Sequence, residues 1–268
     1  MHPIILGRVE VDFIRSILNE KHFDEVYVCK LQFANKSKGL LLELMDKSHV
    51  DLVAILPFVI TTDKTVYENL MKLKLKTLGR IESSFIHGLI EEIYAKIREN
   101  KDLAYTLTLR KDTIYVKEKG KKTIDKIPVE INGEGAKIFP LIYKNPTVAY
   151  DVSVKPLSKV LKLLDKRDIE IELAFDTLKI IFNDHIDEAY VEMTANVIAL
   201  TIGEQINRVK IHVFPILRKM LKTFPRISYL NSIVMIVENN MPVTIFRPLD
   251  TTTLMYMLAP IIKDQEEE

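Results

Sequence analysis

Four segments of the chain carry apolar residues at the spacing of an amphipathic helix, and they lie at 11–22, 83–100, 157–165 and 214–224. In each segment the hydrophobic residues recur three and four positions apart, so that they share one helical face. The third segment, for example, has Leu157, Val160, Leu161 and Leu164. The pattern therefore predicts four amphipathic helices distributed along the whole chain.

Between these segments the hydrophobic pattern changes to a period of two residues, which is typical of strands. The alternating stretches lie at 26–28, 40–44, 49–56, 72–75, 105–109, 113–117, 170–173, 178–182, 209–213, 233–237 and 243–246. Each predicted helix is thus followed by several short strands, and this order repeats along the chain. The sequence predicts an α+β fold of two similar domains, each with two helices packed on meandering antiparallel sheets.

The segment 132–146 interrupts this repeat. It contains two glycines and two prolines, shows no clear periodicity, and has the composition of an extended linker. Its apolar cluster is unusual for a solvated linker, because Ile138, Phe139, Leu141 and Ile142 favour folding back onto a surface or contact with a partner. We therefore predict an N-terminal domain over 1–131, a connector over 132–146 and a C-terminal domain over 147–268.

The composition is that of a soluble globular protein, with 47% hydrophobic and 28% charged residues among 268. The 38 basic and 37 acidic residues nearly cancel, so overall charge indicates no partner. The single cysteine, Cys29, excludes an intrachain disulfide and is expected to be a small buried hydrophobe. No apolar run approaches the roughly 18 residues that cross a bilayer, and the charged N-terminus does not fit a signal peptide. We therefore expect an intracellular protein with no membrane association.

The sequence carries no motif of catalytic chemistry. Phosphate-binding loops, nucleophile elbows and zinc-protease motifs are missing from it, and its six histidines are scattered without metal-ligand spacing. The nearest approach to a carboxylate–histidine group is the cluster of Asp184, His185, Asp187 and Glu188. Such a cluster is more often a polar loop between strands. The expected protein is not an enzyme and needs no metal or cofactor; an α+β hydrolase is the remote alternative.

Basic residues gather on the predicted helices. Lys155, Lys159, Lys162 and Lys166 are four, three and four positions apart, so they share one face of the third helix. The second helix has Lys96, Arg98 and Lys101, and the fourth has Arg218, Lys219 and Lys222. A basic helix face is most often simply solvated, but here both helices of the second half are basic. Aromatic residues do not alternate with these lysines, which favours contact with a duplex backbone over stacking on single-stranded bases.

Three short stretches of the chain are distinctive when taken together. Residues 45–53 read Met-Asp-Lys-Ser-His-Val-Asp-Leu-Val, residues 241–243 read Met-Pro-Val, and residues 257–260 read Met-Leu-Ala-Pro before an acidic tail. These stretches resemble segments of the sliding clamps of the proliferating-cell-nuclear-antigen (PCNA) family. The resemblance implies the DNA clamp fold. It also implies a ring of three two-domain subunits around duplex DNA, in which the chain acts as a processivity factor for replication and repair.

The resemblance further implies a hydrophobic pocket that binds the PCNA-interacting peptide, or PIP box, of client proteins. The implied pocket residues are Met45, His49, Leu52, Leu141, Ile142, Pro242, Met257, Leu258, Ala259 and Pro260. The expected clients are DNA polymerase, clamp loader, ligase or nuclease. The basic residues implied to face DNA are Arg15, Lys96, Arg98, Lys155, Lys159, Lys162, Lys166, Arg218, Lys219 and Lys222.

Ring closure requires edge strands that a neighbouring subunit can complete. The expected edges are the strand around 122–131 in the first half and the strand around 178–182 in the second. The near-neutral overall charge differs from the acidic charge that is common in the family. A heterotrimeric or checkpoint-type clamp subunit is therefore the alternative to a homotrimer. The expected location is the cytoplasm of an archaeon, or the nucleus or replication site of a eukaryotic or viral system.

Overall fold

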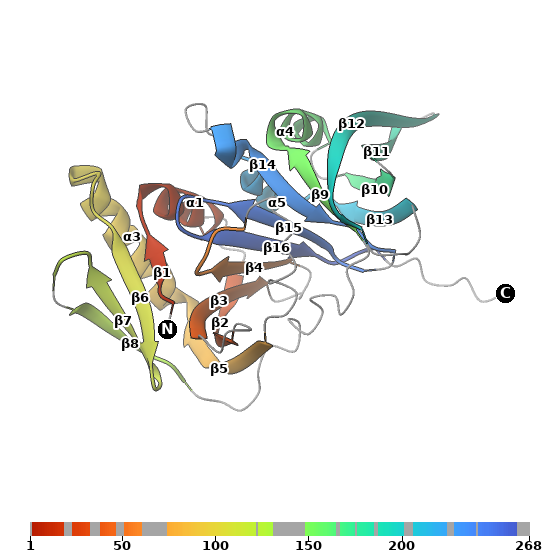
Figure 1. The fold of residues 1–268 in the computed structure, drawn as a ribbon. Coiled ribbons are helices and arrows are strands. Elements are labelled where there is room, and N and C mark those ends of the chain that lie inside the picture. Colours follow the sequence, from red (N-terminus) through yellow and green to blue (C-terminus); the bar gives the residue numbers. More distant parts are fainter. Residues whose placement is uncertain are drawn as a thin grey trace. The chain divides into compact units, whose positions relative to one another are not determined.

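Antiparallel strands and short helices make up the chain in the computed structural model (Figure 1). The structure describes residues 2–18, 23–32, 38–46, 51–60, 74–121, 123–130, 148–164, 167–174, 176–184, 187–200, 206–223, 228–239 and 241–261. The chain divides into two units. Unit 1 comprises Met1–Lys144 and Pro248–Met255, and unit 2 comprises Asn145–Arg247 and Tyr256–Glu268.

Unit 1 contains two sets of antiparallel strands. The first set has the order β1 (Ile4–Leu6), β6 (Tyr105–Arg110), β7 (Thr113–Glu118) and β8 (Thr123–Pro128). The second has the order β4 (Asp51–Leu56), β3 (Lys38–Asp46), β2 (Phe23–Gln32) and β5 (Lys74–Glu82). Strands β3 and β4 are buried along almost their full length, which explains why their sequences are nearly continuous apolar runs.

Two helices of unit 1 pack against each other, and both are amphipathic. Helix α1 (Arg8–Leu18) buries Phe13, Ile14 and Ile17, and helix α3 (Ser83–Glu99) buries residues three and four positions apart from Ile86 to Ile97. Burial of these two apolar stripes is the main interaction that holds the helices in place.

A buried carboxylate fixes the start of α1. Glu10 Oε2 accepts a hydrogen bond from the backbone N–H of Gly7 at 3.1 Å, which is the returning half of a capping box. The other oxygen, Oε1, accepts the backbone N–H of Thr251 at 2.7 Å. A Cβ at Gly7 would lie 3.1 Å from Oε2, so a larger residue there would crowd the cap. Glu10 thereby ties the helix to the 248–255 segment within unit 1.

Unit 2 contains strands in the order β13 (Ile206–His212), β10 (Asp168–Ala174), β11 (Thr177–Asp184), β12 (Asp187–Leu200), β9 (Val148–Ser153), β14 (Ser232–Ile236) and β15 (Val243–Pro248). Its helices are α4 (Val154–Leu163) and α5 (Pro215–Met220), which contact each other. A 3₁₀ turn, η2 (Ser228–Asn231), precedes β14. The last residue of β15, Pro248, belongs to unit 1, and the last strand, β16 (Thr253–Leu258), is divided between the two units after Met255.

The α+β character and all four predicted helices are confirmed, although the helix ends differ from those expected. Helix α1 begins three residues earlier than predicted because the Glu10 cap lies before the apolar stripe. Helix α4 begins at Val154, which is buried like Leu157 and Leu161. The predicted connector at 132–146 lies outside the described residues, so the domain boundaries at 131 and 147 stay a prediction.

The strand predictions are less complete. Strand β8 lies at the edge of its sheet, as expected, but β11 does not, because it is hydrogen-bonded to β10 on one side and β12 on the other. The prediction of an edge at 178–182 is therefore wrong. Strands β1, β9, β12 and β16 were not predicted, and β5 runs over Lys74–Glu82 rather than 72–75.

Unit 1 also buries an acidic side chain that the sequence analysis did not single out. Glu43 on β3 is fully buried, and its carboxyl group has no nitrogen or oxygen hydrogen-bond partner among the described residues. Burial raises the pKa of the Glu43 carboxyl to about 8, while a weak contact with the thiol of Cys29 acts in the opposite direction. Cys29 itself is buried, as expected. Glu43 is therefore protonated in the folded chain at neutral pH.

This buried acid predicts a pH dependence of stability. The unfolded chain releases the Glu43 proton near pH 4.5 and the folded chain near pH 8, so the free energy of unfolding should fall as pH rises between these values. The Glu43→Gln variant should lose this part of the pH dependence. It amounts to about 1.4 kcal/mol in the free energy of unfolding for each unit by which the folded and unfolded pKa values of Glu43 differ. Urea unfolding across the pH range measures it, with exposed Glu99→Gln as control. Parallel pH profiles for wild type and Glu43→Gln would contradict the assignment.

Candidate nucleic-acid interface

Three lysines form an exposed row on α4. Lys155, Lys159 and Lys162 are exposed, whereas Leu157 and Leu161 on the other side of the helix are buried. The three ammonium groups form no ion pair with any described residue. Lys166, the fourth member of the predicted row, lies outside the described residues. The exposed side of α4 is thus a row of cations whose charge is not neutralised locally.

Helix α5 adds a second basic surface in unit 2. Lys222, just after the helix, is exposed, while Arg218 and Lys219 are half-buried and have partners of their own. The end of the helix is held by Arg247, whose Nη2 donates to the backbone C=O of Lys222 at 2.7 Å. Burial lowers the pKa of Arg247 to about 10, so the guanidinium stays charged at neutral pH. A buried cation therefore positions the C-terminal end of α5.

In unit 1, two of the predicted DNA-facing residues are neutralised by neighbours. Arg15 Nε donates to Glu91 Oε1 at 2.7 Å, and its guanidinium lies 4.1 Å from the centre of the Tyr94 ring. Lys96 forms an ion pair with Glu92, one turn earlier on α3. These partners leave Arg15 and Lys96 with less net charge to offer a ligand than their sequence positions suggested.

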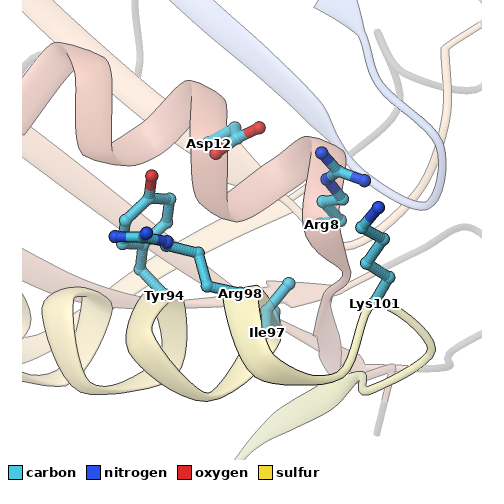
Figure 2. Close-up of a pocket in the computed structure, with 6 residues that line it drawn as sticks. All are labelled: Arg8, Asp12, Tyr94, Ile97, Arg98 and Lys101. Atoms are coloured by element: carbon cyan, nitrogen blue, oxygen red, sulfur yellow. The ribbon is translucent and has the colours of Figure 1, made fainter.

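A basic pocket lies between α1 and α3 (Figure 2). The cavity has a volume of about 250 Å³ and is lined by Arg8, Asp12, Tyr94, Ile97, Arg98 and Lys101. Arg8, Arg98 and Lys101 are exposed and form no ion pair with the described residues. Of these cations, only Arg98 was in the predicted DNA-facing set. Arg8 was missed because the predicted helix began at residue 11, after the position that now forms the first turn.

The described residues of the predicted peptide pocket fall into both units. Met45 and Leu52 are paired across β3 and β4 in unit 1 and are 2% and 3% exposed. In unit 2, Met257 and Leu258 are buried as well, while Pro242, Ala259 and Pro260 are half-exposed. His49, Leu141 and Ile142 lie outside the described residues. The pocket as a whole stays a prediction.

Two strands offer backbone groups for pairing with another chain. Among the strands that the structure describes, β8 has one neighbour, β7. Strand β12 pairs with β11 over 187–194 and with β9 over 195–200, so each half has one partner strand among the described residues. Its first half exposes Glu188, Tyr190 and Glu192. Such strands can extend a sheet into a second copy by a head-to-tail contact.

The other chemical candidates can be followed only in part. Asp184 and Asp187 are register partners at the ends of β11 and β12, and the role of the cluster that they form in the sequence stays a prediction. His185 lies outside the described residues. Over the described ranges, three or more His, Cys, Asp or Glu side chains nowhere gather in a way that could hold a metal. In the same ranges, no helix is long and apolar enough to cross a membrane.

Comparisons with known proteins give matches at the level of structure. No protein-family model matches the chain, and no curated protein matches it. Among solved structures, it is similar to the proliferating cellular nuclear antigen of Entamoeba histolytica, with 15% identity, a TM-score of 0.55 and coverage of 97% of this chain and 98% of the other. It is similar to PCNA from Thermococcus kodakaraensis, with 16% identity, a TM-score of 0.59 and coverage of 96% and 99%.

A third similar structure is the PCNA2–PCNA3 complex of Sulfolobus tokodaii, with 11% identity, a TM-score of 0.57 and coverage of 97% of this chain and 99% of the other. All three matches extend over nearly the full length of both chains, so the similarity covers both units. The chain therefore has the fold of the PCNA sliding clamps.

Proposed function

We propose that the chain is a subunit of a DNA sliding clamp, a ring that encircles duplex DNA and tethers enzymes to it without being an enzyme itself. The observation that carries this proposal is the exposed row of Lys155, Lys159 and Lys162 on α4, in a chain with the clamp fold. A row of cations without local partners is suited to a regular line of phosphates. It reads no base sequence, as sliding requires.

Ring closure is proposed to join β8 of one subunit to the first half of β12 of the next. The charges around the two strands are complementary. The stretch 117–126, which covers the end of β7, the turn and the start of β8, contains five lysines and two carboxylates, whereas residues 187–194 contain three carboxylates and neither lysine nor arginine. Opposite charges on two different edges favour a head-to-tail contact, which closes into a ring when the rotation is right. Three copies are the proposed number. A mixed ring with related chains is the alternative, because one of the similar structures is a PCNA2–PCNA3 complex.

Client docking is proposed at the half-exposed residues Pro242, Ala259 and Pro260 of unit 2. These residues offer apolar surface without titratable chemistry. An aliphatic and two aromatic side chains of a PIP-box peptide would supply the matching apolar anchors. Tethering polymerase, ligase or nuclease in this way raises the effective concentration of the enzyme at the DNA.

The DNA surface predicts a specific salt effect. The Lys159→Gln and Lys162→Gln double variant should bind a duplex more weakly regardless of sequence, because two phosphate contacts are lost. The slope of log affinity against log salt should become shallower by about 1.8. Fluorescence anisotropy of a labelled duplex over a range of salt concentrations measures both quantities.

The matched control is the Lys38→Gln and Lys76→Gln double variant, which removes two exposed lysines from strands of unit 1. It changes net charge equally, so its slope should stay close to that of wild type. An unchanged slope in the α4 variant, or equal loss in both variants, would show that α4 does not contact DNA.

The proposed docking surface predicts that a charge placed on it weakens peptide binding. Ala259→Glu should reduce binding of a PIP-box peptide at least tenfold, since an unpaired carboxylate would be placed against the apolar anchors of the peptide. Leu258 is unsuitable for this test because it is buried, and a charge there would disturb the fold. Calorimetric titration of the peptide measures the effect, with Leu163→Glu on the exposed side of α4 as control. Equal affinity for Ala259→Glu and wild type would remove this assignment.

A further inference from the structure

The proposed docking surface lies where two segments of unit 2 leave the sheet. Pro242 comes directly before β15, and Ala259 and Pro260 come directly after β16. The two strands are neighbours in the sheet and are joined by residues 249–252, so they form a hairpin (Figure 1). The start of β15 and the end of β16 therefore lie at the same end of this hairpin.

The two prolines are held only weakly by the sheet itself. Pro242 and Pro260 have no backbone N–H, so neither can donate a ladder hydrogen bond to a neighbouring strand. Both residues are half-exposed, so packing holds them only in part. Their positions therefore depend on contacts of the residues next to them.

Two hydrogen bonds attach those neighbouring residues to strand β13. The side-chain Oδ1 of Asn239 accepts the backbone N–H of Arg208 at 2.7 Å. The backbone N–H of Ile261 donates to the C=O of Lys210 at 2.8 Å. Because Arg208 and Lys210 are two positions apart on one strand, about 7 Å, the two segments are attached to β13 side by side.

Strand β13 has backbone groups to offer because it pairs with β10 on one side only, among the strands that the structure describes. In an antiparallel ladder, alternate residues direct their N–H and C=O groups to opposite edges of the strand. The hydrogen bonds to Asn239 and Ile261 use the groups of Arg208 and Lys210 that the ladder with β10 leaves on the outer edge.

Both attachment points lie close to the docking surface along the chain. Asn239 belongs to a turn that is closed by a hydrogen bond from the N–H of Met241 to the C=O of Glu238 at 3.1 Å, and Pro242 is the next residue. On the other segment, Ile261 directly follows Pro260. Movement at either attachment point is thus passed to a proline of the surface.

We propose that Asn239 and Ile261 are positioning residues, which hold Pro242 and Pro260 in the arrangement that a docked peptide contacts. This inference rests on the proposed docking of client peptides in unit 2. Without the two hydrogen bonds, both segments would have to be ordered when the peptide binds, and that ordering weakens binding.

The test pairs each disruptive variant with one that keeps the hydrogen-bonding atom. Asn239→Ala removes the acceptor, whereas Asn239→Asp keeps an oxygen in its place. Ile261→Pro removes the N–H donor, whereas Ile261→Ala keeps it. Calorimetric titration of a PIP-box peptide into the full chain measures the affinity, and thermal melting verifies that each variant is folded.

Asn239→Ala and Ile261→Pro should each weaken peptide binding by about threefold to tenfold, the scale of one hydrogen bond. Asn239→Asp and Ile261→Ala should bind like wild type. Wild-type affinity in both disruptive variants would overturn the proposal. So would an equal loss in the two members of either pair, because the side chain and not the hydrogen bond would then matter.

Hydrogen exchange in the wild-type chain gives a second measurement that needs no substitution. Peptide binding should slow exchange at the backbone amides of Arg208 and Ile261, because both become more rigidly held. Unchanged exchange at both amides in the peptide complex would overturn the proposal.

Failure of the docking proposal gives a different result. In that case the wild-type chain does not bind the peptide, and both proposals are overturned together. If wild type binds, Ala259→Glu abolishes binding and neither disruptive variant changes it, the docking proposal stands and the positioning role alone is overturned.

Discussion

The 3.6-residue period of the helix, with apolar residues on one side and basic residues on the other, is the constraint on which the candidate interface depends. On α4, burial of Leu157 and Leu161 leaves Lys155, Lys159 and Lys162 exposed, because the two sets occupy opposite sides of one helix. Each buried leucine contributes about 2–3 kcal/mol, whereas burying an unpaired ammonium group would cost far more. The orientation of the lysine row therefore follows from core packing.

Buried polar groups then fix where the helices begin and end. Glu10 holds the start of α1 through Gly7 and ties it to Thr251, and Arg247 holds the end of α5 through the carbonyl of Lys222. Both side chains are fully buried and use backbone groups as partners, which compensates much of the cost of removing a charge from water. In each unit, a buried polar side chain thus fixes one end of a helix.

The helices could be predicted from the sequence because each has a strong one-sided apolar stripe. Strand β12 could not, because it alternates exposed residues such as Glu188 and Tyr190 with only partly buried ones, and so lacks a consistent apolar side. The prediction that β11 is an edge strand failed for a different reason. Which strands lie next to each other depends on the tertiary fold, and the local hydrophobic pattern does not encode it. Likewise, Glu91 pairs with Arg15 across 76 positions, which no local pattern reveals. Glu92 and Lys96, in contrast, are four positions apart on one helix. Their spacing alone could have indicated that Lys96 is paired and is a weaker candidate for contact with DNA.

The central claim is that the chain encircles DNA, and topological retention tests it most directly. The assembled protein is mixed with a linear duplex, both DNA ends are then blocked with bulky groups, and the complex is washed at a salt concentration that screens backbone contacts. An encircling ring should remain on the blocked duplex and leave when one end is unblocked. Retention that is equally weak or equally strong with open and blocked ends would contradict encirclement.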